Sequence, residues 1–206
     1  MESTLQNSFQ IIADGIAEHG YAMVDHFLAP AEVAAILALE SFSKAEGFHQ
    51  AGIGKNQHHQ VNEAIRGDQI QWLETEAPAP LQVYLERLHA LRGFLKESLF
   101  LSLRDVEVHQ TIYPPGAYYK RHLDQFKKDD HRRLSVICYL NPNWTAQEGG
   151  QLRIYLEPGS VDVLPIAGRL VCFRSDLLEH EVLPATRPRL SITGWMLDQL
   201  AELRHL

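Results

Sequence analysis

The chain contains a single His-x-Asp sequence, His122-Leu123-Asp124, at the end of a longer stretch that begins at Tyr113. On a strand, side chains two positions apart point to the same face, so the imidazole and the carboxylate can enter one cavity. One nitrogen and one oxygen ligand leave a metal site incomplete. A mononuclear non-haem Fe(II) centre needs a second imidazole, which completes a facial set of three ligands and leaves positions open for chemistry.

His180 is the best candidate for that second imidazole. It is the only histidine between His131 and His205, and it leads into a strand-like run. A histidine must be neutral to donate a lone pair to a metal. We therefore predict His122, Asp124 and His180 as metal ligands and catalytic residues; the alternative for His180 is a structural histidine on a strand.

Arg189 could bind an anionic ligand. It alternates with the apolar Leu190 and Ile192, so an inward-facing guanidinium would be a buried charge in need of a partner. A ligand carboxylate suits the guanidinium, which can donate two parallel charge-assisted hydrogen bonds. The alternative is an Arg on the outer face with a surface ion pair, and the spacing leaves both open.

The elements that would position these residues fall into two halves. Helical spacing of apolar residues predicts helices over 4–19, from Pro30 to a stop at Gly47, and from Pro78 and Pro80 to Leu99. A strand is expected at 21–24 and another at 69–73. Short runs separated by turn residues then predict strands over 104–112, 118–124, 133–140, 151–156, 161–166, 169–174, 179–183 and 189–197.

This order of elements is typical of a mainly β protein with N-terminal helices. We expect a double-stranded β-helix, or jelly roll, braced by about three α-helices. The 206 residues suffice for one good core. We therefore predict a single domain over 1–206, with helical support over about 1–100 and a jelly-roll core over about 101–197.

Composition narrows the classes of function. The formal net charge of -7 disfavours a protein that tracks nucleic-acid phosphates. No apolar run approaches the length of a membrane span, and the N-terminus lacks the pattern of a signal peptide. The two cysteines, Cys138 and Cys172, lie in apolar runs, which favours buried thiols in a reducing compartment. We expect a cytoplasmic protein without nucleic-acid or membrane partners.

The segment 48–64 loses periodicity and is rich in Gly, Gln, His and Asn. Long loops in compact domains are often functional lids, so we expect a mobile loop here. His58 and His59 lie in it. No carboxylate stands at ligand spacing from them, so we interpret them as solvated loop histidines.

Further segments extend the pattern beyond the metal and Arg positions. They are Ala64–Glu74, Cys138–Asn141 with Trp144, Gly149–Ile154, His180–Val182 with Pro184 and Arg189, and Ile192–Trp195. With them the chain resembles Fe(II)- and 2-oxoglutarate-dependent dioxygenases over roughly residues 20 to 198. It resembles specifically the prolyl hydroxylases that act as oxygen sensors on hypoxia-inducible factor, and still more closely their bacterial relatives.

The resemblance implies roles around the cosubstrate. Arg189 would pair with the distal carboxylate of 2-oxoglutarate, helped by the Tyr139 hydroxyl. Tyr113 would hydrogen-bond near its metal-binding end, and Thr193 would lie close to the metal. Trp195 would wall the iron pocket. Tyr139 and Trp195 could equally be ordinary strand aromatics.

The resemblance also implies a substrate side. Arg66 and Asp68 would form an ion pair that governs the loop over the substrate, although such a pair is often only a surface feature. Tyr118 and Tyr119 compete for the position before the metal ligands, and we favour Tyr119. The segment between Tyr113 and His122 is a residue shorter than in the animal enzymes, which affects the placement of Tyr113.

The implied reaction uses Fe(II), 2-oxoglutarate and O₂, with ascorbate as reductant, and yields succinate and CO₂. The implied product is trans-4-hydroxyproline in a loop of a protein substrate, with a translation elongation factor of the Tu type as a candidate. One alternative is hydroxylation of free proline or another small molecule. A second is a non-catalytic jelly-roll binding module, against which the complete set His122, Asp124, His180 and Arg189 argues.

Overall fold

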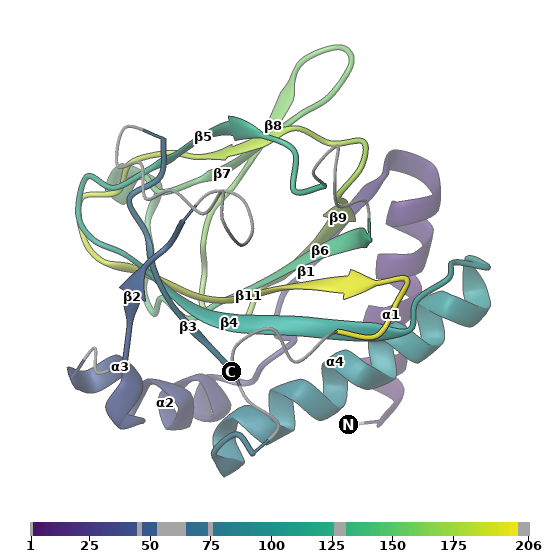
Figure 1. Cartoon of the computed structure of the whole chain (residues 1–206), viewed down its shortest axis with the longest axis horizontal. Helices are drawn as coiled ribbons and strands as arrows, with labels where there is room; N and C mark the ends of the chain where they lie inside the picture. Colours follow the sequence, from purple (N-terminus) through teal and green to yellow (C-terminus); the bar gives the residue numbers. More distant parts are fainter. Residues whose placement is uncertain (1, 45–46, 53–64, 74–75, 126–130, 202–206) are drawn as a thin grey trace.

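Two antiparallel sheets form the body of the fold in the computed structural model, which describes residues 2–44, 47–52, 65–73, 76–125 and 131–201 (Figure 1). The seven-stranded sheet has the order β1-β9-β6-β11-β4-β3-β2, and the four-stranded sheet has the order β5-β10-β7-β8. The strands are β1 (Tyr21–Val24), β2 (His49–Gln50), β3 (Gln69–Trp72), β4 (Asp105–Tyr113), β5 (Tyr119–His122), β6 (Arg132–Tyr139), β7 (Leu152–Tyr155), β8 (Ser160–Val163), β9 (Leu170–Arg174), β10 (His180–Val182) and β11 (Arg189–Leu197). The expected double sheet is confirmed.

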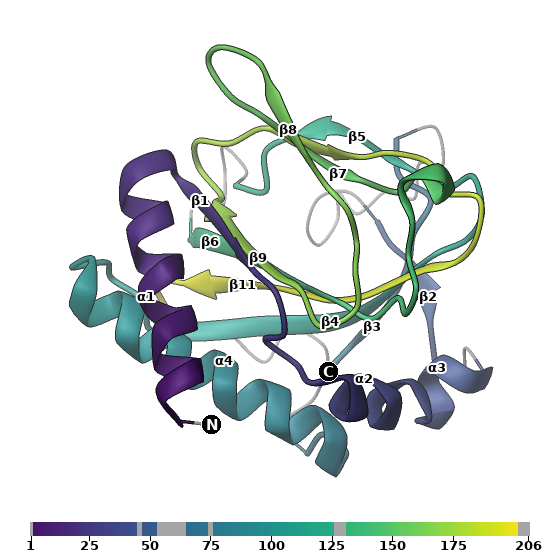
Figure 2. The same ribbon diagram turned by 180° about the vertical axis from the view of Figure 1, so that it is seen from behind.

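Helices cover only one side of the seven-stranded sheet. They are α1 (Glu2–His19), α2 (Pro30–Leu37), α3 (Glu40–Lys44) and α4 (Ala79–Ser98); a short 3₁₀ helix, Ala146–Glu148, lies elsewhere, just before β7. In Figure 1 α4 runs below β4 and β11, and Figure 2 shows α1 alongside β1. The four-stranded sheet lies on the opposite side, so a space between the two sheets is left for side chains of both.

Strand alternation sends apolar side chains to the helical side. On β11, Ile192 and Met196 join Val136 and Cys138 of β6 in one large apolar cluster with the helices. Thr193 and Trp195, which alternate with them on β11, face the other sheet and line the cavity there. The helices contribute one stripe each to this cluster: Phe9, Ile12, Ala13 and Ile16 from α1, and Leu81, Tyr84, Leu88, Leu91 and Leu95 from α4.

Glycine and proline residues mark the ends of two of the expected helices. Gly20 has φ +78 and its N–H donates to the Ile16 carbonyl at 3.1 Å, which ends α1. A left-handed backbone at this position favours glycine. Pro78 stands at the N-cap of α4, and Pro80 lies in its first turn, where the missing N–H has no partner to lose.

Two expectations need correction. The helix expected from Pro30 to Gly47 is divided into α2 and α3, because the Leu39 N–H bonds to Ile36 and the Phe42 N–H to Leu39, a tighter i to i+3 pattern. The described part therefore has four α-helices, which agrees with the expected brace of about three. The segment 48–64, expected to be loop throughout, begins with β2, in which His49 pairs with Ile70. His58 and His59 lie outside the described residues.

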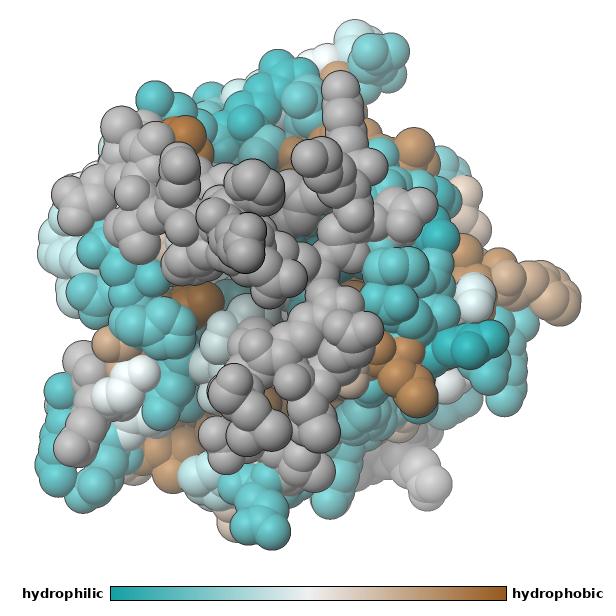
Figure 3. Space-filling model, viewed as in Figure 1, coloured by the Kyte–Doolittle hydropathy of each residue, from teal (hydrophilic) through white to brown (hydrophobic). Residues whose placement is uncertain are grey.

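The two cysteines are buried, as their apolar sequence surroundings predicted. Both thiols are free, and burial raises the pKa of the Cys172 thiol to about 12. The face seen in Figure 1 carries mostly hydrophilic residues, with hydrophobic atoms in separate spots (Figure 3). Within the described residues, we find no helix that combines the length and the apolarity of a membrane span.

Candidate metal centre

The two predicted histidine ligands are cross-strand neighbours in the four-stranded sheet. His122 is the last residue of β5 and His180 the first of β10, and the two are paired in register. Their ring centroids are 4.3 Å apart. Asp124 lies two residues beyond the end of β5, in a bend rather than on the strand that the sequence suggested. It nevertheless reaches both rings.

The ligand atoms of the three side chains converge. His122 Nε2 lies 3.4 Å from Asp124 Oδ1, and His180 Nε2 lies 3.6 Å from Asp124 Oδ2. One ligand atom from each residue lies within 4.8 Å of the other two. Two imidazoles and one carboxylate at this separation form the facial set that non-haem Fe(II) oxygenases use, with further positions left open.

Hydrogen bonds at the other ring nitrogens prepare both histidines for a metal. His122 Nδ1 lies 2.6 Å from the Lys120 carbonyl, and His180 Nδ1 lies 3.3 Å from the Leu178 carbonyl. A carbonyl only accepts, so each Nδ1 carries the hydrogen and each Nε2 keeps its lone pair for the cavity. Ligating histidines in metalloproteins are oriented in this way. The donor set therefore fits a divalent metal.

Burial and charge favour the ligand forms of these groups. Burial lowers the pKa of His180 to about 4, although the Asp124 carboxylate opposes this shift. Burial alone would raise the pKa of Asp124, but the facing His180 and His122 outweigh it and hold that pKa well below the usual range. At neutral pH the site offers a neutral imidazole at 180 and an anionic carboxylate at 124.

Arg189 is a buried cation at the start of a strand. The residue is 1% exposed, and it begins β11 opposite Tyr113 of β4. Its Nε donates to the Gly150 carbonyl at 2.9 Å and its Nη2 to the Tyr139 hydroxyl at 3.4 Å. Among the described residues, no carboxylate lies within ion-pair distance of the guanidinium. A buried charge needs a counter-charge, so the site fits a ligand carboxylate.

The cavity between the two sheets is lined by Arg189 and by the three predicted metal ligands His122, Asp124 and His180. Its lining also includes Tyr113 and Thr193, so the shortened segment before His122 leaves Tyr113 at the site. Tyr139 is absent from the lining, but its hydroxyl contacts Arg189 Nη2, which belongs to the lining. The cavity is lined by Arg66, Asp68, His109, Thr111, Tyr113, Tyr119, His122, Asp124, Arg132, Ile137, Leu152, His180, Val182, Arg189, Thr193 and Trp195.

Arg66 and Asp68 form a buried, two-bonded ion pair at the cavity. Arg66 Nε and Nη2 donate to Asp68 Oδ1 and Oδ2 at 2.7 and 2.5 Å, and Asp68 is 1% exposed. The surface alternative for this pair is therefore wrong. The Arg66 guanidinium lies 4.5 Å from the Tyr119 ring centroid, and Tyr119 stacks on the His122 ring at 3.6 Å. Tyr119, rather than Tyr118, thus lies against the metal ligand.

Sequence reasoning missed several cavity residues. His109 is 2% exposed, and its Nδ1 lies 2.9 Å from the Thr111 hydroxyl. Burial lowers the pKa of His109 to about 3, so it is neutral at pH 7. Arg132 lies 3.4 Å from the Trp195 ring centroid and pairs with Glu107 at 2.8 Å. Counting back by twos from Tyr113 would have placed His109 and Thr111 on the same face.

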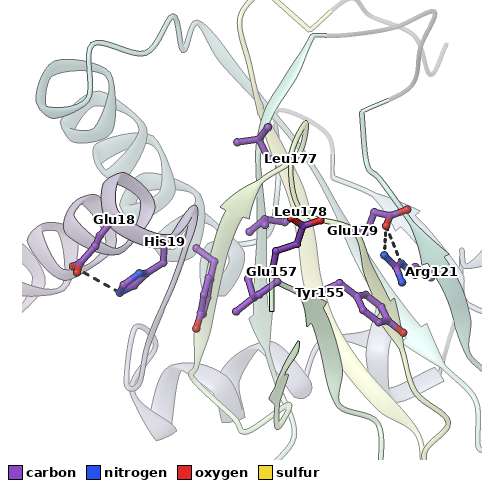
Figure 4. Close-up of a pocket in the computed structure, with 10 residues that line it drawn as sticks. Glu18, His19, Arg121, Tyr155, Glu157, Leu177, Leu178 and Glu179 are labelled. Atoms are coloured by element: carbon purple, nitrogen blue, oxygen red, sulfur yellow. Dashed lines mark hydrogen bonds and ion pairs between the residues drawn. The ribbon is translucent and has the colours of Figure 1, made fainter. Parts of the chain in front are cut away.

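A larger surface groove lies away from this site. It is bordered by the end of α1, with Glu18 and His19, and by Tyr155 and Arg121 on the outer side of the four-stranded sheet (Figure 4). Arg121 pairs there with Glu179. The metal triad faces the opposite side of these strands, so the groove takes no part in the site.

Comparisons with known proteins agree with this geometry. A family model described as the 2OG-Fe(II) oxygenase superfamily matches residues 108–197. Human prolyl hydroxylase EGLN3 is 31% identical over 211 residues, which cover 93% of this chain and 84% of that protein. The hypoxia-inducible factor prolyl hydroxylase of Caenorhabditis elegans is 44% identical over 94 residues, covering 43% of this chain and 13% of that protein.

Solved structures extend the similarity to the whole fold. A Pseudomonas putida prolyl-4-hydroxylase superposes with a TM-score of 0.84 at 41% identity, covering 93% of this chain and 100% of that one. A prolyl hydroxylase from Trichoplax adhaerens, in complex with a hypoxia-inducible factor peptide fragment, gives a TM-score of 0.84 at 26% identity, with 95% of this chain and 91% of that one covered. Both similarities include the helices as well as the two sheets.

Proposed function

The chain belongs to the 2OG-Fe(II) oxygenase superfamily, among the relatives of the prolyl hydroxylases, and from this premise we propose that it hydroxylates a prolyl residue in a protein substrate at the trans-4 position. It is a 2-oxoglutarate-dependent dioxygenase of the prolyl hydroxylase type. The observation that carries the proposal is the cavity in which His122, Asp124 and His180 converge and in which the buried Arg189 has no carboxylate partner among the described residues.

We assign the metal to His122, Asp124 and His180, and the distal carboxylate of 2-oxoglutarate to Arg189. Fe(II), 2-oxoglutarate and O₂ together supply the oxidising power for C–H hydroxylation, with succinate and CO₂ as co-products. The protein's own residues bind 2-oxoglutarate and orient it in the cavity. The Arg189 guanidinium donates charge-assisted hydrogen bonds, and the Tyr139 hydroxyl, which now contacts Nη2, is free to donate to the same carboxylate.

Tyr113 and Thr193 complete the proposed cosubstrate site. Tyr113 is paired in register with Arg189 and is 6% exposed, so its hydroxyl can donate to a ligand in the cavity. The Thr193 hydroxyl lies 3.3 Å from both Thr111 and Ser191 hydroxyls. Trp195 closes the cavity as a 7% exposed aromatic wall, which helps to exclude water.

Arg66 and Asp68 are proposed to organise the substrate side. Arg66 also donates to the Gly52 carbonyl at 3.2 Å, and the Ala51 N–H donates to the Asp68 carbonyl at 3.0 Å. Gly52 and Ala51 are therefore held beside Arg66 and Asp68. The rest of the expected lid, residues 53–64, lies outside the described residues.

The peptide complex of the Trichoplax relative supports a protein rather than an amino acid as substrate. We propose an elongation factor of the Tu type as a candidate and ascorbate as the reductant. We also propose that residues 1–206 act as one domain and that the buried, unpaired cysteines reflect a cytoplasmic location.

The decisive experiment supplies the purified protein with Fe(II), ascorbate, 2-oxoglutarate and either elongation factor Tu or free proline. Succinate release with a gain of one oxygen on a prolyl residue, mapped by mass spectrometry, is the expected result. Turnover of free proline with no modified protein would replace the substrate assignment. A second arm captures partners on the His122→Ala protein and searches them for oxidised prolines. Absence of succinate release under every condition would indicate a non-catalytic binding module.

A further inference from the structure

Asp124 differs from the two histidines in how it is held. His122 and His180 are paired strand residues, and the carbonyls of Lys120 and Leu178 fix their ring orientation. Asp124 lies beyond the last residue of β5, so no strand pairing positions it. It is nevertheless 8% exposed. Contacts from elsewhere in the fold must therefore fix its carboxylate.

Two buried hydroxyls make that contact. Ser135 Oγ donates to Asp124 Oδ2 at 2.6 Å, and Ser175 Oγ lies 2.8 Å from Ser135 Oγ. Ser135 is 1% exposed and Ser175 is fully buried. Ser135 lies on β6, and Ser175 directly follows β9, which pairs with β6. The contact therefore originates in the seven-stranded sheet, across the cavity from the strand of His122.

The direction of these hydrogen bonds follows from the donors available. A hydroxyl has one hydrogen, and Ser135 gives its hydrogen to the carboxylate, which only accepts. Ser175 must then donate to Ser135. Such a chain strengthens the bond to the carboxylate, because each hydroxyl polarises the next. The backbone adds a second link, since the Gln125 N–H donates to the Ser175 carbonyl at 3.1 Å.

We propose that Ser175 and Ser135 form a hydroxyl relay that positions Asp124 for metal binding. They are positioning residues, because they act through Asp124 and touch neither metal nor substrate. Ser135 bonds to Oδ2, which faces His180 Nε2 at 3.6 Å, and thereby orients Oδ1 toward His122 Nε2 at 3.4 Å. The inference rests on the proposed function, since it takes Asp124 to be a ligand.

A matched pair of variants tests the relay. Ser135→Thr and Ser135→Val have nearly the same shape and add the same methyl, but only threonine keeps the hydroxyl. The metal-free proteins are titrated with Mn²⁺ by calorimetry, and their thermal unfolding is followed separately. Ser135→Val is expected to bind Mn²⁺ about 10- to 100-fold more weakly than wild type, which is the usual effect of losing such an outer contact. Ser135→Thr should stay within about 3-fold.

Ser175→Ala tests the second step. It should weaken Mn²⁺ binding less than Ser135→Val, and it should add nothing in the Ser135→Val background, because residues of one network are not additive. Equal affinities of the threonine and valine variants would overturn the relay, as would full additivity with Ser175→Ala. Should the added methyl unfold both variants, Ser135→Ala, which is smaller, takes their place and must still lose at least about 10-fold.

The Mn²⁺ titration of the wild-type protein distinguishes failure of the relay from failure of the metal centre. Wild type that binds Mn²⁺ while every serine variant binds equally well would refute the relay alone. Wild type that fails to bind Mn²⁺ would refute the metal centre itself, and the relay with it.

Discussion

The two faces of the seven-stranded sheet carry opposite chemistry on the same strands. On β4 and β11, Val108, Ile192 and Met196 face the helices in an apolar core, whereas His109 and Thr193 face the cavity. The alternation of strand side chains is the only thing that separates them. Neighbouring residues on one strand therefore serve different purposes. Substitutions on the helical face should change stability, and substitutions on the cavity face should change activity.

The polar face is stable because its groups are paired with one another. Thr111 bonds to His109 and Thr193, and Thr193 lies within bonding distance of Ser191. Buried polar groups that are hydrogen-bonded avoid most of the penalty of leaving water. Arg189 donates hydrogen bonds to the Gly150 carbonyl and the Tyr139 hydroxyl, but no carboxylate among the described residues balances its charge.

His180→Ala, on the cavity face, should give the largest difference between the effect on activity and the effect on stability. Loss of one metal ligand should reduce succinate release by at least about 1,000-fold, equivalent to about 4 kcal/mol. The free energy of unfolding of the metal-free protein should stay within about 1 kcal/mol of wild type, since no apolar core is lost. Substantial turnover in this variant, measured with added Fe(II), would remove His180 from the metal site.

The reverse result is expected for Leu91→Ala on the helical side. Leu91 is fully buried in the apolar cluster. Its truncation should lower the free energy of unfolding by about 2–5 kcal/mol in urea denaturation. The kcat per folded molecule, assayed well below the unfolding temperature, should not change. A parallel fall in kcat would show that the two faces are coupled.

Arg189→Lys should weaken binding of 2-oxoglutarate without changing the affinity for the metal. Lysine keeps the charge but loses the paired donors of the guanidinium. We expect the KM for 2-oxoglutarate to rise about 10- to 100-fold, in line with the loss of about 1.5–3 kcal/mol in hydrogen bonds to a charged group. The affinity for Mn²⁺ without 2-oxoglutarate serves as the control and should match wild type. An unchanged KM would place the carboxylate elsewhere.

His109 should give the polar face a pH-dependent stability. Its pKa is lowered from 6.5 to about 3 by burial, so between these values the unfolded chain binds a proton that the folded one does not. The stability contributed by neutral His109 is full above pH 6.5 and is lost as the pH falls toward about 3.

The measurement compares wild type with His109→Gln by urea denaturation in the metal-free state. The free energy of unfolding of wild type should fall more steeply with decreasing pH below 6.5, by up to about 1.4 kcal/mol per pH unit for one proton. His180 titrates in both proteins and cancels from the difference. Parallel pH profiles would mean that His109 is solvated.

The sequence was most informative where the pattern is local. Alternation located the strands that became β4 to β11, and helical spacing located α1 and α4. The His-x-Asp sequence identified two residues of the cluster that could hold a metal ion, although Asp124 lies past the strand end. The pairing of His180 with His122 could not be derived from spacing, because register depends on contacts between distant segments.

Burial was the main quantity that sequence reasoning could not supply. Arg66 and Asp68 look like a surface pair in isolation, and only the packing of β3 and β5 around them shows that Asp68 is enclosed. The same holds for Ser135, a small polar residue inside an apolar run whose partner, Asp124, lies on a separate segment. The break between α2 and α3 was not predicted either; α3 also contacts a distant segment, since Ser41 Oγ donates to Gln110 Oε1 of β4.

The isolated guanidinium at 189 has a consequence for regulation by metabolites. A dicarboxylate that brings one carboxylate to it relieves an electrostatic penalty stored in the folded protein, so such molecules should raise the melting temperature. Succinate shares that carboxylate with the cosubstrate but lacks the keto group. Under the proposed function, succinate released in each turnover should therefore compete with 2-oxoglutarate for Arg189, and the rate of turnover should follow the ratio of these two dicarboxylates.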